Sequence, residues 1–263
     1  MGKFCSTERE GRLLVVTIER PEVYNALHPM ANQELSDAFD AFAADPELWV
    51  AIVTGAGDKA FCTGNDLKYH AALRARTGER PVHPPKGFAG LTARFDLDKP
   101  VIAAVNGIAM GGGFEIALAC DLIIASDQAS FALPEPRVGL AAGAGGLQRL
   151  PRAIPLKHAM GMMLTGRRVP AEEGYRLGFV TAVVPHAKLM SEARRWAGMI
   201  LECSPMSVRA TKQVAMRALG VPVLEAAMQN ASYPAYVAMA NSEDAIEGPK
   251  AFAEKRKPVW QGR

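Results

Sequence analysis

The 263-residue sequence contains few cysteines, and their spacing matches neither a metal site nor a disulfide framework. The four thiols are far apart in the chain and form no CxxC pair: Cys5, Cys62, Cys120 and Cys203. Structural zinc sites and disulfide-rich domains both need closely spaced cysteines. We therefore expect reduced thiols, most of them buried, and no metal.

Long apolar runs and a strong charge of one sign are also absent. No window of about 18 apolar residues could span a bilayer, and the first residues lack the apolar core of a signal peptide. The net charge of +3 is too small to indicate nucleic-acid binding. Hydrophobic residues make up 49% of the chain and charged residues 22%, as in globular proteins. We expect a cytoplasmic enzyme or binding protein with no nucleic-acid partner and no membrane segment.

The motifs of several common enzyme classes are missing. There is no GxSxG elbow, HExxH pair or GxxxxGK[ST] loop, and the glycines from Gly139 to Gly146 do not make a GxGxxG motif because Gln148 stands where the third glycine should. The histidines lie outside any ligand spacing, and each is expected to be a surface or satisfied histidine: His28, His70, His83, His158 and His186. Nucleotide binding through a phosphate loop is therefore not predicted.

Apolar patterns indicate an α/β body. Strands are expected at residues 13–19, 49–54, 101–105, 122–126 and 179–184, and helices at residues 30–43, 113–120, 156–164 and 170–177. Strand and helix alternate with short connections, which indicates stacked turns of sheet covered by helices. The irregular residues 67–99 predict a short helix and a long loop, typical of a substrate lid or specificity segment.

No strand pattern remains after Pro185. Helices are expected at residues 187–201, 205–219, 223–239 and 243–253. We therefore expect two regions, an α/β body over residues 1–185 and a helical region over residues 186–263. The apolar side chains of the helical region could pack within the chain or against a neighbouring subunit, and both alternatives stay open.

The chain is organised around residues 99–140. An apolar strand runs into the triplet Gly111-Gly112-Gly113, and a strand that ends in glycines and feeds a helix leaves free N–H groups at the helix start. The helix dipole favours negative charge there. The same strand, glycine and helix pattern occurs at Gly64-Asn65. These two turns predict donors for a developing oxyanion.

Two glutamates follow the second turn. Glu115 lies in the apolar segment FEIALAC, where a carboxylate needs a polar partner or a raised pKa. Taken alone, it could be an acid or base, or a glutamate favoured by the helix dipole, and Glu135 could be an exposed loop acid. Together, two carboxyl groups and two N–H donors match reactions at the α-carbon of a thioester, which pass through an enolate.

Motifs from nearly the whole chain resemble the crotonase, or enoyl-CoA hydratase/isomerase, superfamily. They are RPEVYNAL, FCTGNDLK, KPVIAAVNGIAMGGGFEIALACDLIIA, ASFALPEPRVGL, GAGGLQRLPR, LTGRRVPAEE and FAEKRKP. The resemblance implies an α/β fold, the crotonase-type spiral of ββα turns, with a C-terminal helical trimerisation region. It implies a homotrimer or a hexamer built as a dimer of trimers.

The resemblance also implies roles for individual residues. The N–H groups of Asn65 and Gly112 form the oxyanion hole for the thioester carbonyl, and Glu115 and Glu135 are the two hydratase carboxylates. An acyl-CoA thioester is the substrate, so no separate cofactor is needed. The implied contacts to the substrate and coenzyme A are Val23, Asn25, Ala26, Leu27, Gly64, Asp66, Leu67, Phe252 and Lys255.

The implied activity is that of an enoyl-CoA hydratase, a carbon–oxygen lyase that interconverts a 2-enoyl-CoA and a 3-hydroxyacyl-CoA. Two alternatives are an isomerase that uses Glu135 alone and a non-catalytic crotonase-fold binding or scaffold protein. GFAGLT and the C-terminal SEDAIEGPKAFAEKRKPVWQGR resemble the carnitinyl-CoA dehydratase group, whose substrate carries a trimethylammonium group. Tyr69, Phe88 and Phe95 could form an aromatic cage or pack as lid and core. That group commonly has tryptophan where this chain has Asn65, which leaves the acyl group open.

Overall fold

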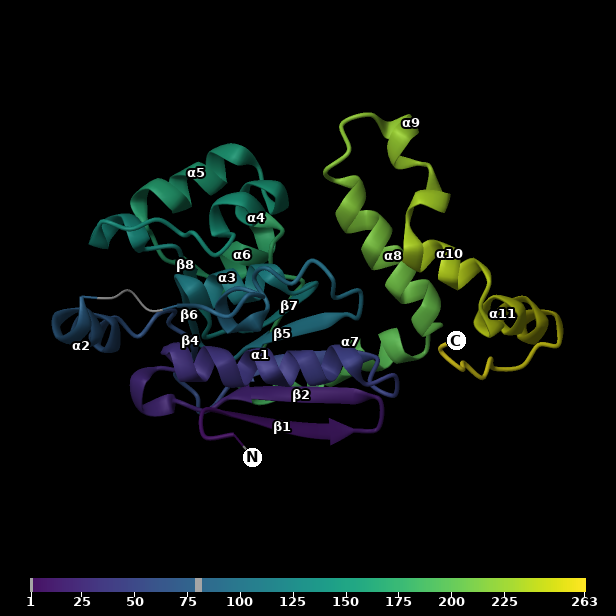
Figure 1. The fold of residues 1–263 in the computed structure, drawn as a ribbon, viewed down its shortest axis with the longest axis horizontal. Helices are drawn as coiled ribbons and strands as arrows, with labels where there is room; N and C mark the ends of the chain where they lie inside the picture. Colours follow the sequence, from purple (N-terminus) through teal and green to yellow (C-terminus); the bar gives the residue numbers. More distant parts are fainter. Residues whose placement is uncertain (1, 79–81) are drawn as a thin grey trace.

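Two β-sheets form the centre of the fold in the computed structural model, which describes residues 2–78 and 82–263 (Figure 1). The larger sheet has the order β1-β2-β3-β5-β7-β10 and the smaller one the order β4-β6-β8-β9. The larger sheet consists of Cys5–Glu10, Leu13–Ile18, Val50–Gly55, Val101–Val105, Leu122–Ser126 and Ala182–Val184. The smaller consists of Ala60–Cys62, Ile108–Met110, Ser130–Ala132 and Val169–Pro170.

Successive strands from β3 to β8 alternate between the two sheets. Every pairing among them is parallel, whereas β1 pairs with β2 and β8 with β9 in antiparallel fashion. The chain therefore advances by one strand in each sheet per turn, and the helices connect the turns. This winding confirms the predicted α/β class and its stacked turns of sheet.

Alternating side chains of the large sheet supply two apolar layers. In β2, Leu14 and Val16 belong to the main core, whereas Leu13 and Val15 face the opposite layer. Successive side chains of a strand point to opposite faces, so a strand buried on both sides is apolar throughout. The main core lies between the two sheets and beneath the helices α1 (Pro29–Ala44) and α3 (Gly112–Ala119).

Helix α7 (Leu189–Leu201) covers the other face of the large sheet. Its buried residues Leu189, Ala193 and Ala197 share one helix face and pack in the second apolar layer. The helices that project from the body in Figure 1 begin with α8 (Pro205–Ala218). The division at residue 185 stays a prediction, but α7 packs with the sheet and not with the projecting helices.

Polar contacts of Lys212 and Gln213 anchor α8 to the body. Lys212 Nζ lies 2.7 Å from Asp121 Oδ2, and the Gln213 amide donates to Asp98 Oδ2 over 2.6 Å. The remaining projecting helices are α9 (Leu224–Ala227), α10 (Pro234–Ala240) and α11 (Glu243–Ala253). The body also contains α2 (Leu67–Thr77), α4 (Gly146–Ala153), α5 (Leu156–Thr165) and α6 (Ala171–Leu177).

Two expectations about single elements are wrong, and one strand was missed. The continuous helix expected at residues 223–239 is interrupted before α10, because Pro234 lacks an N–H and restricts Tyr233 to an extended conformation. The last strand begins at Ala182 and not at residue 179, because the N–H groups of Phe179 and Val180 donate to the Gly174 carbonyl of α6. Strand β1 was not predicted, because its sequence CSTERE is mostly charged and polar.

All four cysteines are free thiols; Cys5 and Cys62 are buried, Cys120 is half-buried and Cys203 is exposed. Among the residues that the structure describes, no helix is long and apolar enough to cross a membrane.

Candidate active site

The two glycine turns recognised in the sequence meet in space. Gly64 has a φ of +87°, and a Cβ atom added to it would lie 2.8 Å from the Gly112 backbone nitrogen. A side chain at position 64 is therefore excluded both by the left-handed conformation and by the neighbouring turn. Within residues 2–78 and 82–263, the N–H groups of Asn65 and Gly112 have no hydrogen-bond acceptor. The two adjoining glycine turns thus leave two backbone N–H donors free.

A cavity of about 1400 Å³ opens beside these turns. Asn65, Glu115 and Glu135 all line it, and its wall continues from α2 to α8. The structure therefore brings together the first donor residue and both glutamates, which are far apart in the sequence.

Glu115 lies in the first turn of α3, and its side chain is 3% exposed. Its Oε1 accepts a hydrogen bond of 2.8 Å from the N–H of Gly146, the first residue of α4. Burial raises the pKa of Glu115 to about 7; the Gly146 hydrogen bond lowers it and nearby Glu135 raises it further. A carboxyl with this pKa can both give and take a proton near neutral pH.

Glu135 begins the short 3-10 helix Glu135–Val138, and burial raises its pKa above the ordinary value. Its Oε2 is buried and has no hydrogen-bond partner among the described residues. A Cβ atom on Gly111 would lie 3.0 Å from Glu135 Oε1, so the carboxyl group sits directly against the glycine turn. Its free oxygen is available to a bound molecule.

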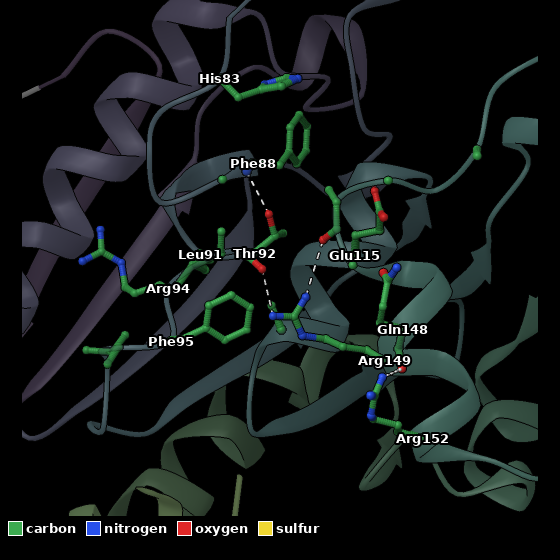
Figure 2. Close-up of a pocket in the computed structure, with 18 of the residues that line it drawn as sticks. His83, Phe88, Leu91, Thr92, Arg94, Phe95, Glu115, Gln148, Arg149 and Arg152 are labelled. Carbon is green, nitrogen blue, oxygen red and sulfur yellow. Dashed lines mark hydrogen bonds between the residues drawn. The ribbon is translucent and has the colours of Figure 1, made fainter. Parts of the chain in front are cut away.

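Arg149 was not singled out from its motif, although it borders this site. Its Nη2 donates to the Thr92 carbonyl over 2.8 Å, and Figure 2 shows the guanidinium reaching from α4 to that loop. Its positive charge acts to lower the pKa of Glu115. Arg149 thus joins the loop that contains Thr92 to α4, the helix whose first N–H donates to Glu115.

The expectation of a surface or satisfied histidine is wrong for His70 but is confirmed for His83, which is exposed. His70 and His83 line the cavity, and His70 Nε2 is buried without a partner in the described part of the chain. Burial lowers the pKa of both, and His83 lowers that of His70 further. Their isolated positions in the sequence carried no signal, because the cavity wall depends on how α2 and the following loop fold. His28 does match the expectation, since its Nδ1 accepts from the Ala31 N–H.

The segment from Val23 to Leu27 lies beside the first glycine turn. The Leu27 N–H donates to the Gly64 carbonyl over 2.8 Å, and the Asp66 N–H donates to the Leu27 carbonyl over 3.0 Å. The fully buried Asn25 uses its amide to donate to the carbonyls of residues 56 and 60, so that side chain holds the turn.

The other predicted contacts are more dispersed. Asp66 pairs with Arg20 at 3.1 Å and caps α2, whereas the exposed Leu67 lines the cavity. Ala26 is buried, and its carbonyl accepts from Arg20. Phe252 is 87% exposed on α11, and neither it nor Lys255 lies among the residues that line the cavity of the same chain.

The three aromatic residues considered for a cage do not gather. The Tyr69 ring packs edge-on against His28, with 5.3 Å between centroids. Phe88 is buried beside His83, and Phe95 is 79% exposed with the Arg149 guanidinium 5.9 Å from its ring centroid (Figure 2). Across the described ranges, no group of three or more His, Cys, Asp or Glu could hold a metal ion.

Comparison with known proteins gives the class that this fold and site define. The model of the enoyl-CoA hydratase/isomerase family matches residues 8–263, and the chain belongs to that family. It is 47% identical to the carnitinyl-CoA dehydratases of Escherichia coli K12 and Citrobacter koseri, over the full length of both partners in each comparison.

Solved structures agree with this assignment. An enoyl-CoA hydratase from Mycobacterium tuberculosis H37Rv superposes with a TM-score of 0.90 at 38% identity, covering 99% of each chain. A carnitinyl-CoA hydratase from Mycobacterium avium gives a TM-score of 0.77 at 41% identity, covering 100% of each chain. The predicted crotonase fold and the resemblance to the carnitinyl-CoA dehydratase group are thereby confirmed.

Proposed function

We propose that the protein is an acyl-CoA hydratase/dehydratase that interconverts a 2-enoyl-CoA and a 3-hydroxyacyl-CoA. The proposal rests on the observation that Glu115 and Glu135 line one cavity beside the free N–H groups of Asn65 and Gly112. An isomerase needs one proton-shuttling carboxylate, whereas the addition of water needs one group for the water and one for the α-carbon. The presence of both glutamates therefore favours hydration.

In the proposed reaction, the thioester oxygen accepts hydrogen bonds from the Asn65 and Gly112 N–H groups. These donors stabilise the negative charge that builds up on the oxygen as the enolate forms. One glutamate takes a proton from water while the water oxygen bonds to the β-carbon, and the other glutamate gives a proton to the α-carbon. Dehydration follows the same steps in reverse. The raised pKa values of the two carboxyl groups suit these transfers near neutral pH.

Coenzyme A is proposed to bind along residues 23–27 and 64–67, mainly through backbone groups. Binding through the backbone is supported by Asn25 and Asp66, because the side chains of both already contact partners within the chain. Phe252 and Lys255 are proposed to reach the coenzyme A of a neighbouring subunit, since α11 projects from the body (Figure 1). This arrangement fits a homotrimer or a dimer of trimers, working in the cytoplasm with no cofactor besides the coenzyme A of the substrate.

The test follows loss of the conjugated enoyl-thioester absorbance with crotonyl-CoA. Glu115→Gln and Glu135→Gln should each lower kcat by about 10²–10⁴-fold, the usual contribution of a general acid or base. Glu172→Gln is the matched control, because Glu172 is exposed on α6. No turnover of crotonyl-CoA or of longer, branched and aromatic enoyl-CoAs would overturn the proposal. Full hydratase activity in Glu115→Gln alone would assign the chemistry to Glu135, as in an isomerase.

A further inference from the structure

One face of α2 forms a wall of the cavity. Leu67, His70, Ala71 and Arg74 follow the spacing of a single helix face, and all four line the cavity. None of the described side chains of α2 is buried in the core, so this face is free to contact a ligand. His83 extends the wall from the following loop. An imidazole and a guanidinium therefore occur where a wholly apolar acyl chain would favour aliphatic side chains.

Unpartnered polar atoms gather at the same place. Asn65 Oδ1, His70 Nε2 and Glu135 Oε2 are buried without a hydrogen-bond partner, and all three residues line the cavity. Most buried polar side-chain atoms in folded proteins are paired, so such a cluster indicates groups that a ligand completes. The proposed reaction uses the Glu135 carboxyl and the Asn65 backbone, which leaves the His70 imidazole for the acyl group.

The charges around the cavity favour an anion. Four guanidinium groups that line it form no salt bridge within residues 2–78 and 82–263: Arg74, Arg149, Arg152 and Arg217. Of the carboxylates in the wall, Asp121 pairs with Lys212, whereas Asp98 accepts from the neutral Gln213 amide and interacts by charge with Arg217. Glu115 and Glu135 also line the cavity, but their raised pKa values reduce their negative charge. The guanidinium groups of Arg74, Arg149 and Arg152 therefore leave an excess of positive charge, which repels a trimethylammonium group and attracts a carboxylate.

We propose that His70 and Arg74 are specificity-determining residues that recognise an acyl group ending in a carboxylate. The inference rests on the proposed hydratase function and deepens it by naming the substrate class. Arg74 lies one helical turn beyond His70, so both can donate to one carboxylate at the acyl end of the cavity. A site built to hydrogen-bond a substrate group discriminates strongly against the analogue that lacks it.

The test compares crotonyl-CoA with two derivatives that carry a carboxylate or a trimethylammonium group on C4. All three share the coenzyme A and the conjugated double bond, so contributions from coenzyme A binding cancel. We expect kcat/KM to be highest for the carboxylate and lowest for the trimethylammonium compound. His70→Leu and Arg74→Gln should each lower kcat/KM for the carboxylate substrate by about tenfold or more, with crotonyl-CoA changing by about twofold at most.

His158→Leu and Arg168→Gln are matched controls, because both residues are exposed and lie outside the cavity. The inference is overturned if the trimethylammonium compound is preferred, if crotonyl-CoA is hydrated with no preference among the three, or if the two variants slow all substrates equally. In those cases the hydratase function still stands. Failure of every substrate would overturn the hydratase function itself. If His70→Leu does not fold, Arg74→Gln and His70→Asn decide the question.

Discussion

Replacing Glu115 by glutamine should stabilise the protein at alkaline pH while it lowers kcat by about 10²–10⁴-fold. The pKa of Glu115 is raised from the ordinary 4.5 to about 7, chiefly by burial. Between these values the unfolded chain has lost the proton that the folded protein still holds. Stability therefore falls as the pH rises through this window and stays reduced above it. Glutamine carries no charge to bury, and its Oε1 can still accept from the Gly146 N–H.

The expected size follows from the two pKa values. At 1.36 kcal/mol per pH unit, the rise from 4.5 to about 7 corresponds to about 3 kcal/mol lost by the natural protein above pH 7. Since Glu115 is 3% exposed, solvent screens little of this effect. Glu115→Gln should therefore match the natural protein at pH 4.5 and exceed its free energy of unfolding by up to about 3 kcal/mol at pH 9.

Urea denaturation at pH 4.5, 7 and 9, at one fixed protein concentration, measures this difference. The fixed concentration matters because an oligomer gains apparent stability by mass action. Glu172→Gln removes an exposed carboxylate and is the control for loss of a surface charge. A Glu115→Gln variant that shows the same stability difference at pH 4.5 and 9, or that is less stable at pH 9, would refute the reasoning.

Two further predictions concern the surroundings of Glu115 and the glycine turns. Gly64→Ala should lower kcat for crotonyl-CoA by at least about 10²-fold, because its Cβ would displace the Gly112 donor, and circular dichroism should show an intact fold. Arg149→Met removes a positive charge that lowers the pKa of Glu115. The pKa of Glu115 should then rise, so the part of the pH profile of kcat/KM that reflects its titration should move to higher pH. Arg152→Met should leave that part of the profile in place.

Gly139→Ala is a control for the first of these predictions. Gly139 also has a positive φ, of +71°, but no atom of the described residues lies within 4 Å of its added Cβ. Equal losses in Gly64→Ala and Gly139→Ala would attribute the effect to backbone strain and contradict the role of the Gly112 donor. A profile that does not move in Arg149→Met would contradict the charge effect on Glu115.

Local patterns predict the body of the fold because its strands are buried on both faces. The apolar run of β5 and the helical spacing of α1 leave little choice of structure. Strand β1 was not predicted, because its outward side chains are polar and its pairing with β2, not its own apolar character, holds it in place. An edge strand of this kind has little sequence signal.

Part of the candidate site could likewise be predicted from local sequence patterns, and part could not. The glycines and glutamates could be found from chain patterns, because buried acids and strand-to-helix glycines are unusual locally. That Gly64 lies against Gly112 is a property of two separate turns of the spiral, which only the resemblance implied. The roles of His70 and Arg149 depend on how α2, α4 and the irregular segment pack, and no local pattern reports that arrangement.

The meeting of the glycine turns has a consequence for how such an enzyme can diversify. Because the proposed donors at positions 65 and 112 are main-chain groups, charge stabilisation does not depend on which side chain stands at position 65. That side chain instead lines the cavity proposed to hold the acyl group, next to the face that carries His70. Single substitutions at one rim of the cavity can therefore change which substrates are accepted. The reaction itself stays the same, because its proposed oxyanion donors are backbone groups. Combinatorial libraries at positions 65, 70 and 74 are a direct route to new acyl selectivity.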